Sequence, residues 1–414
     1  MPTISIFGSS AARKILLIAF ALAVSACAGP AQKRTSIPQP APSVTTPMAP
    51  STPAQVSPPP DPIAAAVQNE VTAVMPPAVV SEPAEPPIPH VALLLPLASK
   101  LLGKVADALR LGFVAGAAAD GKNASLYRIY AADDEGASLA TQYRKAIADG
   151  ASAVIGGLTR DGANTMVRES RLLPALALNA PASTDSELPD QFYYISLSLD
   201  VEARLVARMI SGEDFRSVAV VVANNPLAKR VQESFEKEWL RLSGEIVANI
   251  SFGADSNDAK RVAKTLEKLG GKVSAVFLAA DPAAARSIRP YLPTGMPVFA
   301  TSFTVDPRAE AVANLDLDNL RFLEMPWFAE QDHPAVMAYA KPAQSLPIEL
   351  ERLYALGIDA WRLGQLILKT EIGRSPPPLD GVTGRITQDG RQFVRALSSV
   401  EVRDGRPQLF RPMQ

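Results

Sequence analysis

Apolar runs alternate with amphipathic helix patterns over most of the chain after residue 90. The run at 91–95 has the unbroken hydrophobicity of a strand that is buried on both faces of a sheet, and further strands are predicted at 153–156, 217–222 and 275–278. Helix patterns follow the strands, for example at 103–119 and 226–242. Strands that alternate with helices in this way form βαβ units, so the sequence predicts an α/β fold with parallel sheets flanked by helices.

This alternation occurs twice. A first series has strands at 91–95, 126–130, 153–156 and 176–178, and a second series begins near residue 217. A single hydrophobic core stops growing at about 250–300 residues, and the region from 89 to 414 is longer. The sequence therefore predicts two similar α/β lobes rather than one large sheet.

The first residues have the order of a secretory signal. Arg13 and Lys14 precede an apolar run at 15–23, which is shorter than the about 20 residues that span a bilayer. The sequence Val-Ser-Ala-Cys at 24–27 follows and resembles the lipobox of bacterial lipoproteins. We therefore expect a signal peptide at 1–26, cleavage before Cys27 and lipid on Cys27, with a plain signal peptide as the alternative.

Two further features bear on the compartment. Ala28, and not an aspartate that would favour the inner membrane, follows Cys27, so we expect attachment to the outer membrane, facing the periplasm. Cys27 is the only cysteine, so the predicted exported domain contains no internal disulfide and depends on its hydrophobic core.

Proline is concentrated between the cysteine and the first strand. Seventeen of the 37 prolines lie between residues 28 and 89, where aromatic residues are almost absent. Such a segment cannot bury enough apolar surface to offset the entropy of ordering, so residues 27–88 are predicted to be a lipidated cysteine and a disordered linker. A fully polyproline-like linker of this length would reach roughly 190 Å at about 3.1 Å per residue.

Charge and motifs argue against several classes of function. The 41 basic and 42 acidic residues give a net charge of −1, which does not suggest a nucleic-acid partner. The string Ser-Phe-Glu-Lys at 234–237 matches the S-x-x-K of penicillin-interacting enzymes but lacks the partner motifs. Residues 116–122 have phosphate-loop spacing but end a predicted helix and precede a strand, the reverse of the required order.

Catalytic residues and metal ligands are not expected. The two histidines, His90 and His333, lie far apart in the sequence, and His90 is interpreted as a surface residue at a strand start. The acidic run at 133–135 is interpreted as a helix cap, and the acidic residues at 316 and 318 as a solvated loop. Without a nucleophile–base pair or a ligand cluster, we expect no enzyme activity, no metal and no cofactor.

Several runs carry a resemblance to known proteins. The runs at 91–97, 156–159 and 381–386 look like type I periplasmic binding proteins. The runs at 288–290, 298–302 and especially 352–363 resemble the C-terminal domain of the penicillin-binding protein activator family (LpoA, also called LppC). The similarity covers roughly 89–414. The best-known members carry a helical-repeat domain before this one, where the present chain has only the proline-rich segment.

This resemblance implies a two-lobed clamshell whose chain crosses between the lobes three times. Lobe 1 would comprise about 89–198 and 327–376, and lobe 2 about 199–326 and 377–414.

Candidate binding residues follow from the predicted sheets, because ligands of open α/β sheets lie beyond the carboxyl ends of the strands. These candidates are Leu97, Ser99, Gly157, Thr159, Arg160, Asn179, Asn224, Asp281, Thr301 and Trp327. Thr159 either caps a helix or presents amide donors to an anion, with capping favoured. Trp327 either lines the cleft or fills the core.

The resemblance implies a non-enzymatic outer-membrane lipoprotein that binds and activates a class A penicillin-binding protein, a peptidoglycan synthase. The alternative is a periplasmic receptor for an amino acid or a similar small molecule. A long tether on the outer membrane is awkward for delivery to an inner-membrane permease, which favours the regulator.

Overall fold

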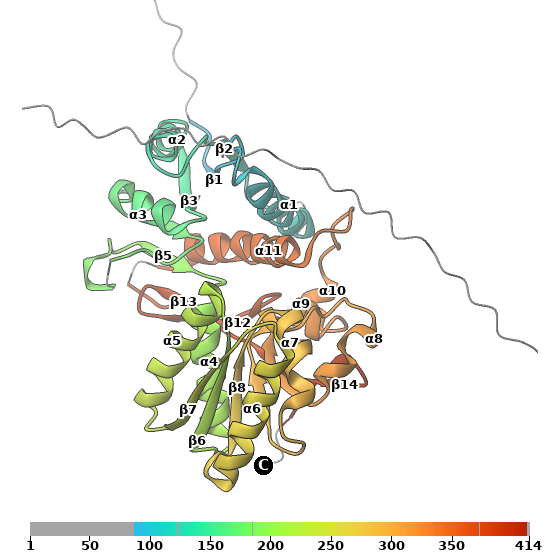
Figure 1. Cartoon of the computed structure of the whole chain (residues 1–414). Helices are drawn as coiled ribbons and strands as arrows, with labels where there is room; N and C mark the ends of the chain where they lie inside the picture. Colours follow the sequence, from blue (N-terminus) through green and yellow to red (C-terminus); the bar gives the residue numbers. More distant parts are fainter. Residues whose placement is uncertain (1–86, 122–123, 184, 372, 412–414) are drawn as a thin grey trace, which may run out of the picture. The chain divides into compact units, whose positions relative to one another are not determined.

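The computed structural model describes residues 87–121, 124–183, 185–371 and 373–411. The predicted signal peptide, Cys27 and the linker up to residue 86 lie outside these residues. The described residues belong to one compact unit. Two sheets of mainly parallel strands, each flanked by helices, make up this unit (Figure 1). The predicted α/β fold with two lobes is confirmed.

The first lobe contains an eight-stranded sheet in the order β11-β12-β13-β5-β4-β3-β1-β2. Its strands are β1 (His90–Leu95), β2 (Tyr127–Ala131), β3 (Ala151–Gly156), β4 (Ala175–Ala177), β5 (Phe192–Ile195), β11 (Leu379–Gly381), β12 (Gly384–Asp389) and β13 (Gln392–Ala396). Its helices are α1 (Gly103–Asp120), α2 (Ala137–Ala148), α3 (Arg160–Glu169) and α11 (Ile348–Lys369).

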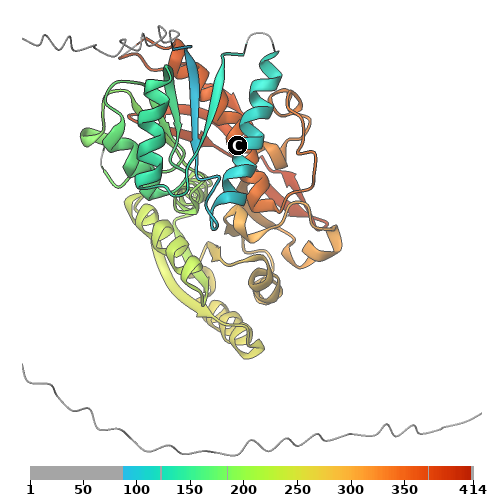
Figure 2. The ribbon, with the colours of Figure 1, turned by 90° about the horizontal axis from the view of Figure 1, so that it is seen from above.

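Strand β1 is buried on both faces, as its unbroken apolar run predicts. Leu93 and Leu95 pack in one hydrophobic cluster with α1 and α11, whereas Leu94 packs in another with α2 and α3. Seen from above, α2 and α3 lie on one side of the sheet and α1 and α11 on the other (Figure 2). The period-2 alternation of a strand therefore divides this run between two helical layers.

The second lobe contains a seven-stranded sheet in the order β15-β14-β10-β9-β8-β6-β7. Its strands are β6 (Ser217–Ala223), β7 (Glu245–Phe252), β8 (Ala275–Ala279), β9 (Val298–Ala300), β10 (Leu320–Glu324), β14 (Ser398–Arg403) and β15 (Arg406–Leu409). Its helices are α4 (Leu199–Gly212), α5 (Pro226–Arg241), α6 (Ser256–Leu269), α7 (Pro282–Ile288) and α8 (Ala311–Asn314), and the short helices α9 (Pro326–Ala329) and α10 (Pro334–Met337) follow β10.

Aromatic side chains fill the core of the second lobe. Phe235 on α5 stacks on Phe277 of β8, with 3.8 Å between ring centroids, and Trp239 lies one turn further along the helix. All three side chains are fully buried. The amphipathic pattern that predicts α5 thus places its aromatic residues against the sheet.

Part of the C-terminal segment belongs to a different lobe from the one that the sequence predicts. The chain changes sheet after β5, after β10 and after β13. Strand β13 pairs with β5, and buried Asp359 of α11 accepts the backbone N–H groups of Val382 and Thr383 in the β11–β12 turn. The assignment of the whole of 377–414 to lobe 2 is therefore wrong, because β11, β12 and β13 extend the first sheet and only β14 and β15 join the second.

Candidate functional site

The loop after β3 is shaped by a glycine and a helix cap. Gly157 has a φ of +65°, and a Cβ there would lie 2.9 Å from the backbone nitrogen of Ala163, so only glycine fits. The Thr159 hydroxyl oxygen accepts the N–H of Gly162 and caps α3. The structure thus shows the capping role that the sequence favours for Thr159.

The backbone N–H groups of this loop donate hydrogen bonds to a carboxylate of the same chain. Glu135, in the loop before α2, accepts the N–H groups of Leu158 and Thr159, each at 2.6 Å. The side chain is buried, and a Cβ at Gly162 would lie 2.6 Å from its carboxylate. Backbone N–H groups at a helix N-terminus are a common site for a ligand's carboxylate. Here Glu135 already fills that position.

The helix-cap interpretation of the acidic run at 133–135 holds for only one of its residues. Asp134 accepts the N–H groups of Gly136 and Ser138 at the start of α2. Glu135 instead accepts N–H groups at the N-terminus of α3, more than twenty residues away in the sequence. Burial raises the pKa of Glu135, and the hydrogen bonds from Thr159 and Leu158 oppose this rise.

Removing the Glu135 carboxylate should open an anion site. Glu135→Ala leaves the buried N–H of Leu158 and the half-buried N–H of Thr159 without an acceptor, and a fully buried group of this kind costs about 1–3 kcal/mol. We expect a lower melting temperature that acetate restores in part and that chloride at equal ionic strength does not. The matched control is Asp134→Ala, which removes an exposed cap and should gain nothing specific from acetate. Equal effects of acetate and chloride on Glu135→Ala would contradict this interpretation.

The other first-lobe candidates lie in loops that follow neighbouring strands of the same sheet. Leu97 and Ser99 are half-buried in the β1–α1 loop, where Ser99 accepts the N–H of Leu102. The Asn179 side chain donates to the carbonyl of Leu158 and accepts the N–H of Ala180. Most polar groups of these candidates therefore stabilise the loops themselves.

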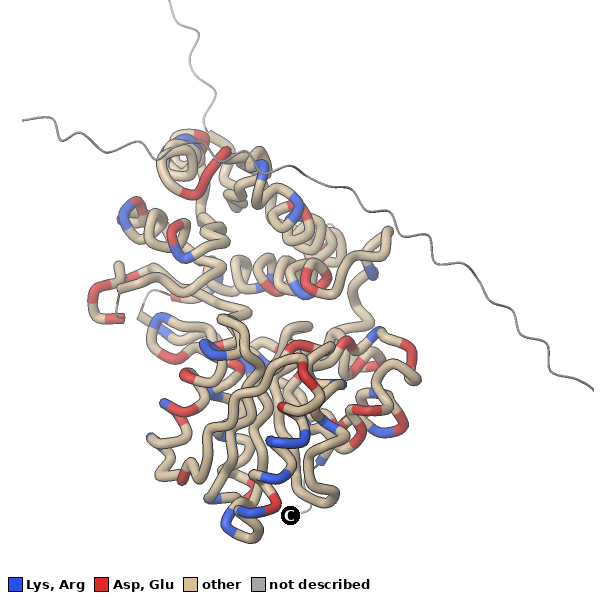
Figure 3. Tube along the Cα trace, in the orientation of Figure 1, with Lys and Arg blue, Asp and Glu red and all other residues tan. Residues whose placement is uncertain are grey.

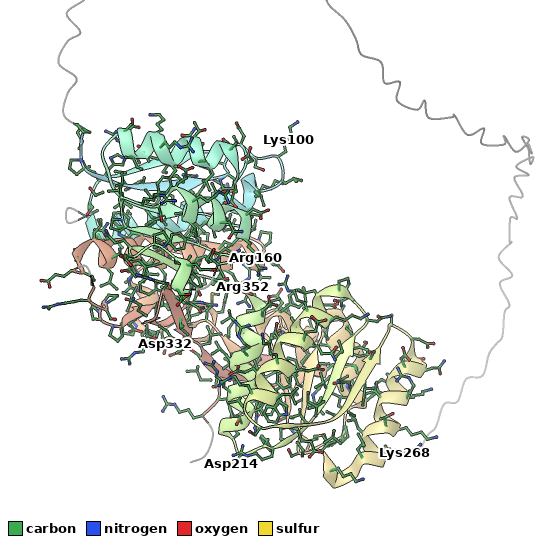
Figure 4. The ribbon with its side chains drawn as sticks, turned by 90° about the vertical axis from the view of Figure 1, so that its left-hand side faces the viewer. Lys100, Arg160, Asp214, Lys268, Asp332 and Arg352 are labelled. Carbon is green, nitrogen blue, oxygen red and sulfur yellow. The ribbon has the colours of Figure 1, made fainter. Side chains whose placement is uncertain are left out.

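One cavity between the lobes includes two of these candidates. It measures about 490 Å³ and is lined by Arg160 and Asn179 of the first lobe and by Asp200 and Arg230 of the second. Asp200 and Arg230 form an ion pair at 2.9 Å. Arg160 is exposed and lies where the two lobes approach each other (Figure 4).

The second-lobe candidates are not brought to that cavity. Asn224 and Asp281 line a separate cavity of about 350 Å³ beyond the carboxyl ends of β6 and β8, where Asp281 also caps α7. Thr301 is buried. Trp327 is fully buried in the core, and its Nε1–H donates to Glu351, so its place among the candidate cleft residues is wrong.

A third cavity, which the sequence does not indicate, lies at the three crossovers. It measures about 370 Å³, and Leu197, Met325 and Leu397 contribute one wall residue from each crossover. We call it the crossover cavity. Its wall also contains the charged side chains of Glu202, Asp306, Glu324, Glu349, Arg352 and Arg395.

A bidentate ion pair joins the lobes beside this cavity. Arg352 of α11 donates to both carboxylate oxygens of Glu324 at the end of β10, at 2.6 and 2.7 Å. A second pair across the lobes joins Arg308 to Glu351 at 2.6 Å. Arg352 lies at the junction of the two lobes in Figure 4. It begins the run at 352–363 that carries the family resemblance most specifically.

Two other buried charges of the cavity have only neutral hydrogen-bond partners. Glu202 accepts the backbone N–H and the hydroxyl of Ser302, and burial raises its pKa to about 7. Arg395 donates to the carbonyls of Ser196 and Thr383, and burial lowers its pKa to about 10. Desolvation is thus the main influence on both groups.

The histidines take structural positions. His90 is buried, not on the surface as the sequence interpretation has it, because its ring nitrogens lie within hydrogen-bond distance of the Ile88 carbonyl and the Tyr130 hydroxyl. Burial and the neighbouring Asp149 raise the pKa of Tyr130 to about 12. His333 caps α10.

Neither a metal-ligand cluster nor a helix able to span a membrane occurs in the described part of the chain. No cluster of three or more histidine, cysteine, aspartate or glutamate side chains there is arranged to hold a metal ion. Within the same residues, no helix is both long and apolar enough to cross a bilayer. Basic and acidic residues are interspersed on both lobes (Figure 3).

Comparison with known proteins identifies a family. The family model described as "LppC putative lipoprotein" matches residues 84–405. "Penicillin-binding protein activator LpoA" of Enterobacter sp. (strain 638) is 28% identical over 280 residues, 58% of this chain and 38% of that protein. The protein of the same name from Escherichia coli (strain K12) is 27% identical over 256 residues, 52% of this chain and 37% of that protein. The chain thus spans less than half the length of these curated relatives.

Solved structures share the fold. A putative branched-chain amino acid ABC transporter protein from Chromobacterium violaceum is 34% identical, with a TM-score of 0.64 over 75% of this chain and 99% of that chain. The LpoA (YraM) C-domain from Haemophilus influenzae, described as a regulator of PBP1A, is 20% identical, with a TM-score of 0.62 over 78% of this chain and 99% of that chain. These similarities confirm the two-lobed type I periplasmic binding protein fold.

Proposed function

Because the chain belongs to the LppC putative lipoprotein family, we propose that it is a non-enzymatic regulator that binds and activates a class A penicillin-binding protein. The curated relatives named penicillin-binding protein activator are the observation that carries this proposal. The domain would act by binding one conformation of the synthase more tightly than another, which shifts the synthase population towards that conformation.

The filled loop after β3 supports a docking protein over a solute receptor. Amino-acid receptors need free polar groups in the cleft, because only the interaction energy that remains after desolvation and ordering appears as affinity. In this chain the N–H groups of Leu158 and Thr159 are bound to Glu135. A docking protein tolerates such a filled site, because its partner need not enter the cleft.

The second candidate function is a periplasmic receptor for an amino acid or a similar small molecule. The 34% identity to the Chromobacterium violaceum protein favours it, because that match covers nearly the whole of that chain. The two functions make different predictions for the loop after β3.

We predict that no common amino acid binds this protein more tightly than about 1 mM, which corresponds to about 4 kcal/mol of binding free energy. The double variant Thr159→Ala and Arg160→Ala should leave partner capture nearly unchanged. Calorimetry of the purified protein against the common amino acids is the measurement. A micromolar dissociation constant that disappears in the double variant would favour the receptor.

We further propose that Cys27 carries lipid and holds the protein on the periplasmic face of the outer membrane. The segment between Cys27 and β1 would then be the tether that lets the domain reach an inner-membrane synthase. More than one acyl chain on the cysteine would make this attachment stable.

Cys27→Ser should yield an uncleaved precursor without lipid, because the serine hydroxyl does not replace the sulfur that receives the diacylglycerol. Mass spectrometry of the membrane and soluble fractions measures both cleavage and lipidation. Normal maturation and continued membrane attachment of the variant would contradict the lipobox interpretation. Ser25→Ala, which keeps a small residue before the cysteine, is the matched control and should mature normally.

Affinity capture from solubilised envelopes tests the proposed partner. We expect a class A penicillin-binding protein to be recovered with the wild-type chain and with the double variant of the β3–α3 loop. Recovery of a solute permease without a cell-wall synthase would instead support the receptor.

A further inference from the structure

The crossover cavity has the dimensions and wall of a small-molecule site. Its volume of about 370 Å³ falls within the range of ligand pockets, about 300–1,000 Å³. Leucine, isoleucine, valine, methionine, proline and phenylalanine side chains make up the apolar part of its wall. Such a wall suits the apolar body of a ligand, and the charged groups determine which polar end the ligand carries.

The charges of the wall are unbalanced. Four carboxylates face two guanidiniums in the lining of the cavity. One carboxylate, Glu324, is neutralised by its bidentate pair with Arg352. Glu202, Asp306 and Glu349 then remain against Arg395, so the rest of the lining has an excess of negative charge. This excess favours a cationic ligand over an anionic one.

Glu202 is the buried member of this acidic set. Its side chain is 6% exposed, and within the described part of the chain it forms no ion pair with a lysine or arginine. Ser302 supplies both of its hydrogen bonds, which leaves acceptor capacity on each carboxylate oxygen. The charge of Arg352 acts on Glu202, but no arginine or lysine of the described residues forms an ion pair with it, so a ligand cation beside Glu202 would supply a direct charged partner.

From this complementarity we propose that the crossover cavity binds a small organic cation, with its apolar body against the leucines and its ammonium group at Glu202. The site is separate from the anion position at the N-terminus of α3. Because Leu197, Met325 and Leu397 each come from a different crossover, the bound cation touches all three connections between the lobes. Its occupancy is therefore coupled to the relative position of the lobes.

Three probes of similar size and different charge test the proposal. 2-Phenylethylamine is a cation, 3-phenylpropionate an anion and 2-phenylethanol neutral at pH 8. Calorimetry with the full purified chain should show the amine binding at least tenfold more tightly than either of the other two. Chemical-shift changes of labelled leucine and methionine methyl groups should include Leu197, Met325 and Leu397.

The pH dependence gives a second readout. The ionised form of Glu202 binds the ammonium, and a proton competes with the cation as the pH falls below the pKa of about 7. The amine should therefore bind about tenfold more tightly at pH 8 than at pH 6. The charged groups around Glu202 are Arg352 on α11, Glu324 on β10 and Arg395 on β13. Both arginines stay charged between pH 6 and pH 8, because the pKa of Arg395 is about 10 and the pKa of Arg352 is raised.

Glu202→Gln keeps the shape and a hydrogen bond to Ser302 but removes the charge. It should weaken amine binding at least tenfold and abolish the difference between pH 6 and pH 8. Glu233→Gln, on the exposed face of α5 and outside the cavity, is the matched control and should bind as the wild type does. If Glu202→Gln does not fold, the pH dependence of amine binding and the methyl chemical shifts of the wild-type protein still test the proposal.

Several results would overturn the proposal. One is that the phenylpropionate binds as tightly as the amine, and another is that folded Glu202→Gln binds the amine with unchanged affinity. The proposal is also wrong if the methyl shifts are confined to another region, or if the amine does not bind at millimolar concentration.

Discussion

Glu324→Ala should lower the free energy of unfolding by about 3–5 kcal/mol, because it leaves the charge of Arg352 without its partner in a largely buried position. Glu324 is 1% exposed, and both of its oxygens accept from Arg352. Since the pair joins α11 of the first lobe to β10 of the second, we also expect the lobes of the variant to vary more in relative position. Urea unfolding and small-angle scattering measure the two effects.

The double variant Glu324→Leu with Arg352→Met distinguishes the loss of the whole ion pair from the loss of one partner. Replacing both partners by apolar residues of similar size is often close to neutral, so most of the stability lost in Glu324→Ala should return. Glu349→Ala is the matched control, since Glu349 is an exposed residue in the first turn of α11 and its loss should cost less than about 0.5 kcal/mol. A loss below about 1 kcal/mol in Glu324→Ala would contradict the structural role of this pair.

Gly112→Ala should destabilise the first lobe by about 3 kcal/mol or more, at or beyond the upper end of the usual cost of overpacking. Helices α1 and α11 touch backbone to backbone at this point. A Cβ on Gly112 would lie 1.8 Å from the carbonyl oxygen of Tyr354, and a Cβ on Gly357 would lie 2.1 Å from that of Leu109. Neither backbone can yield without separating the helices, which also hold Trp361 and Phe113 in edge-to-face contact.

Gly212→Ala is the matched control for this prediction. Gly212 is also helical, at the end of α4, but a Cβ there meets no atom within 4 Å. Alanine has the higher helix propensity, so this variant should be neutral or more stable by up to about 1 kcal/mol. Denaturant unfolding of both variants is the measurement, and equal stability of the two would contradict the close approach of α1 and α11.

The sequence predicts those parts of the fold that depend on local periodicity. The strands at 91–95 and 217–222 and the helix at 226–242 appear within one or two residues as β1, β6 and α5. Local periodicity does not determine the lobe to which β11, β12 and β13 belong. Their position depends on the pairing of β13 with β5 and on the contact of Asp359 with the β11–β12 turn, and both join segments distant in sequence.

The candidate site is predicted less well for the same reason. Thr159 is recognisable as a cap because its partner is three residues away. Glu135 is not recognisable as the carboxylate that fills the α3 N-terminus, because its acceptor role spans more than twenty residues. Only one residue of the crossover cavity stands out in the sequence: Arg352 lies in the largely apolar α11, where a half-buried charge requires a partner, but its partner Glu324 is 28 residues away.

The most direct test of the regulator is the rate of peptidoglycan synthesis by a purified class A penicillin-binding protein from the same organism, with lipid-linked precursor, in the presence and absence of this protein. We expect saturating wild-type protein to raise the rate of the synthase, and the protein alone to form no product. An unchanged rate with folded protein, or product formed by the protein alone, would contradict this expectation.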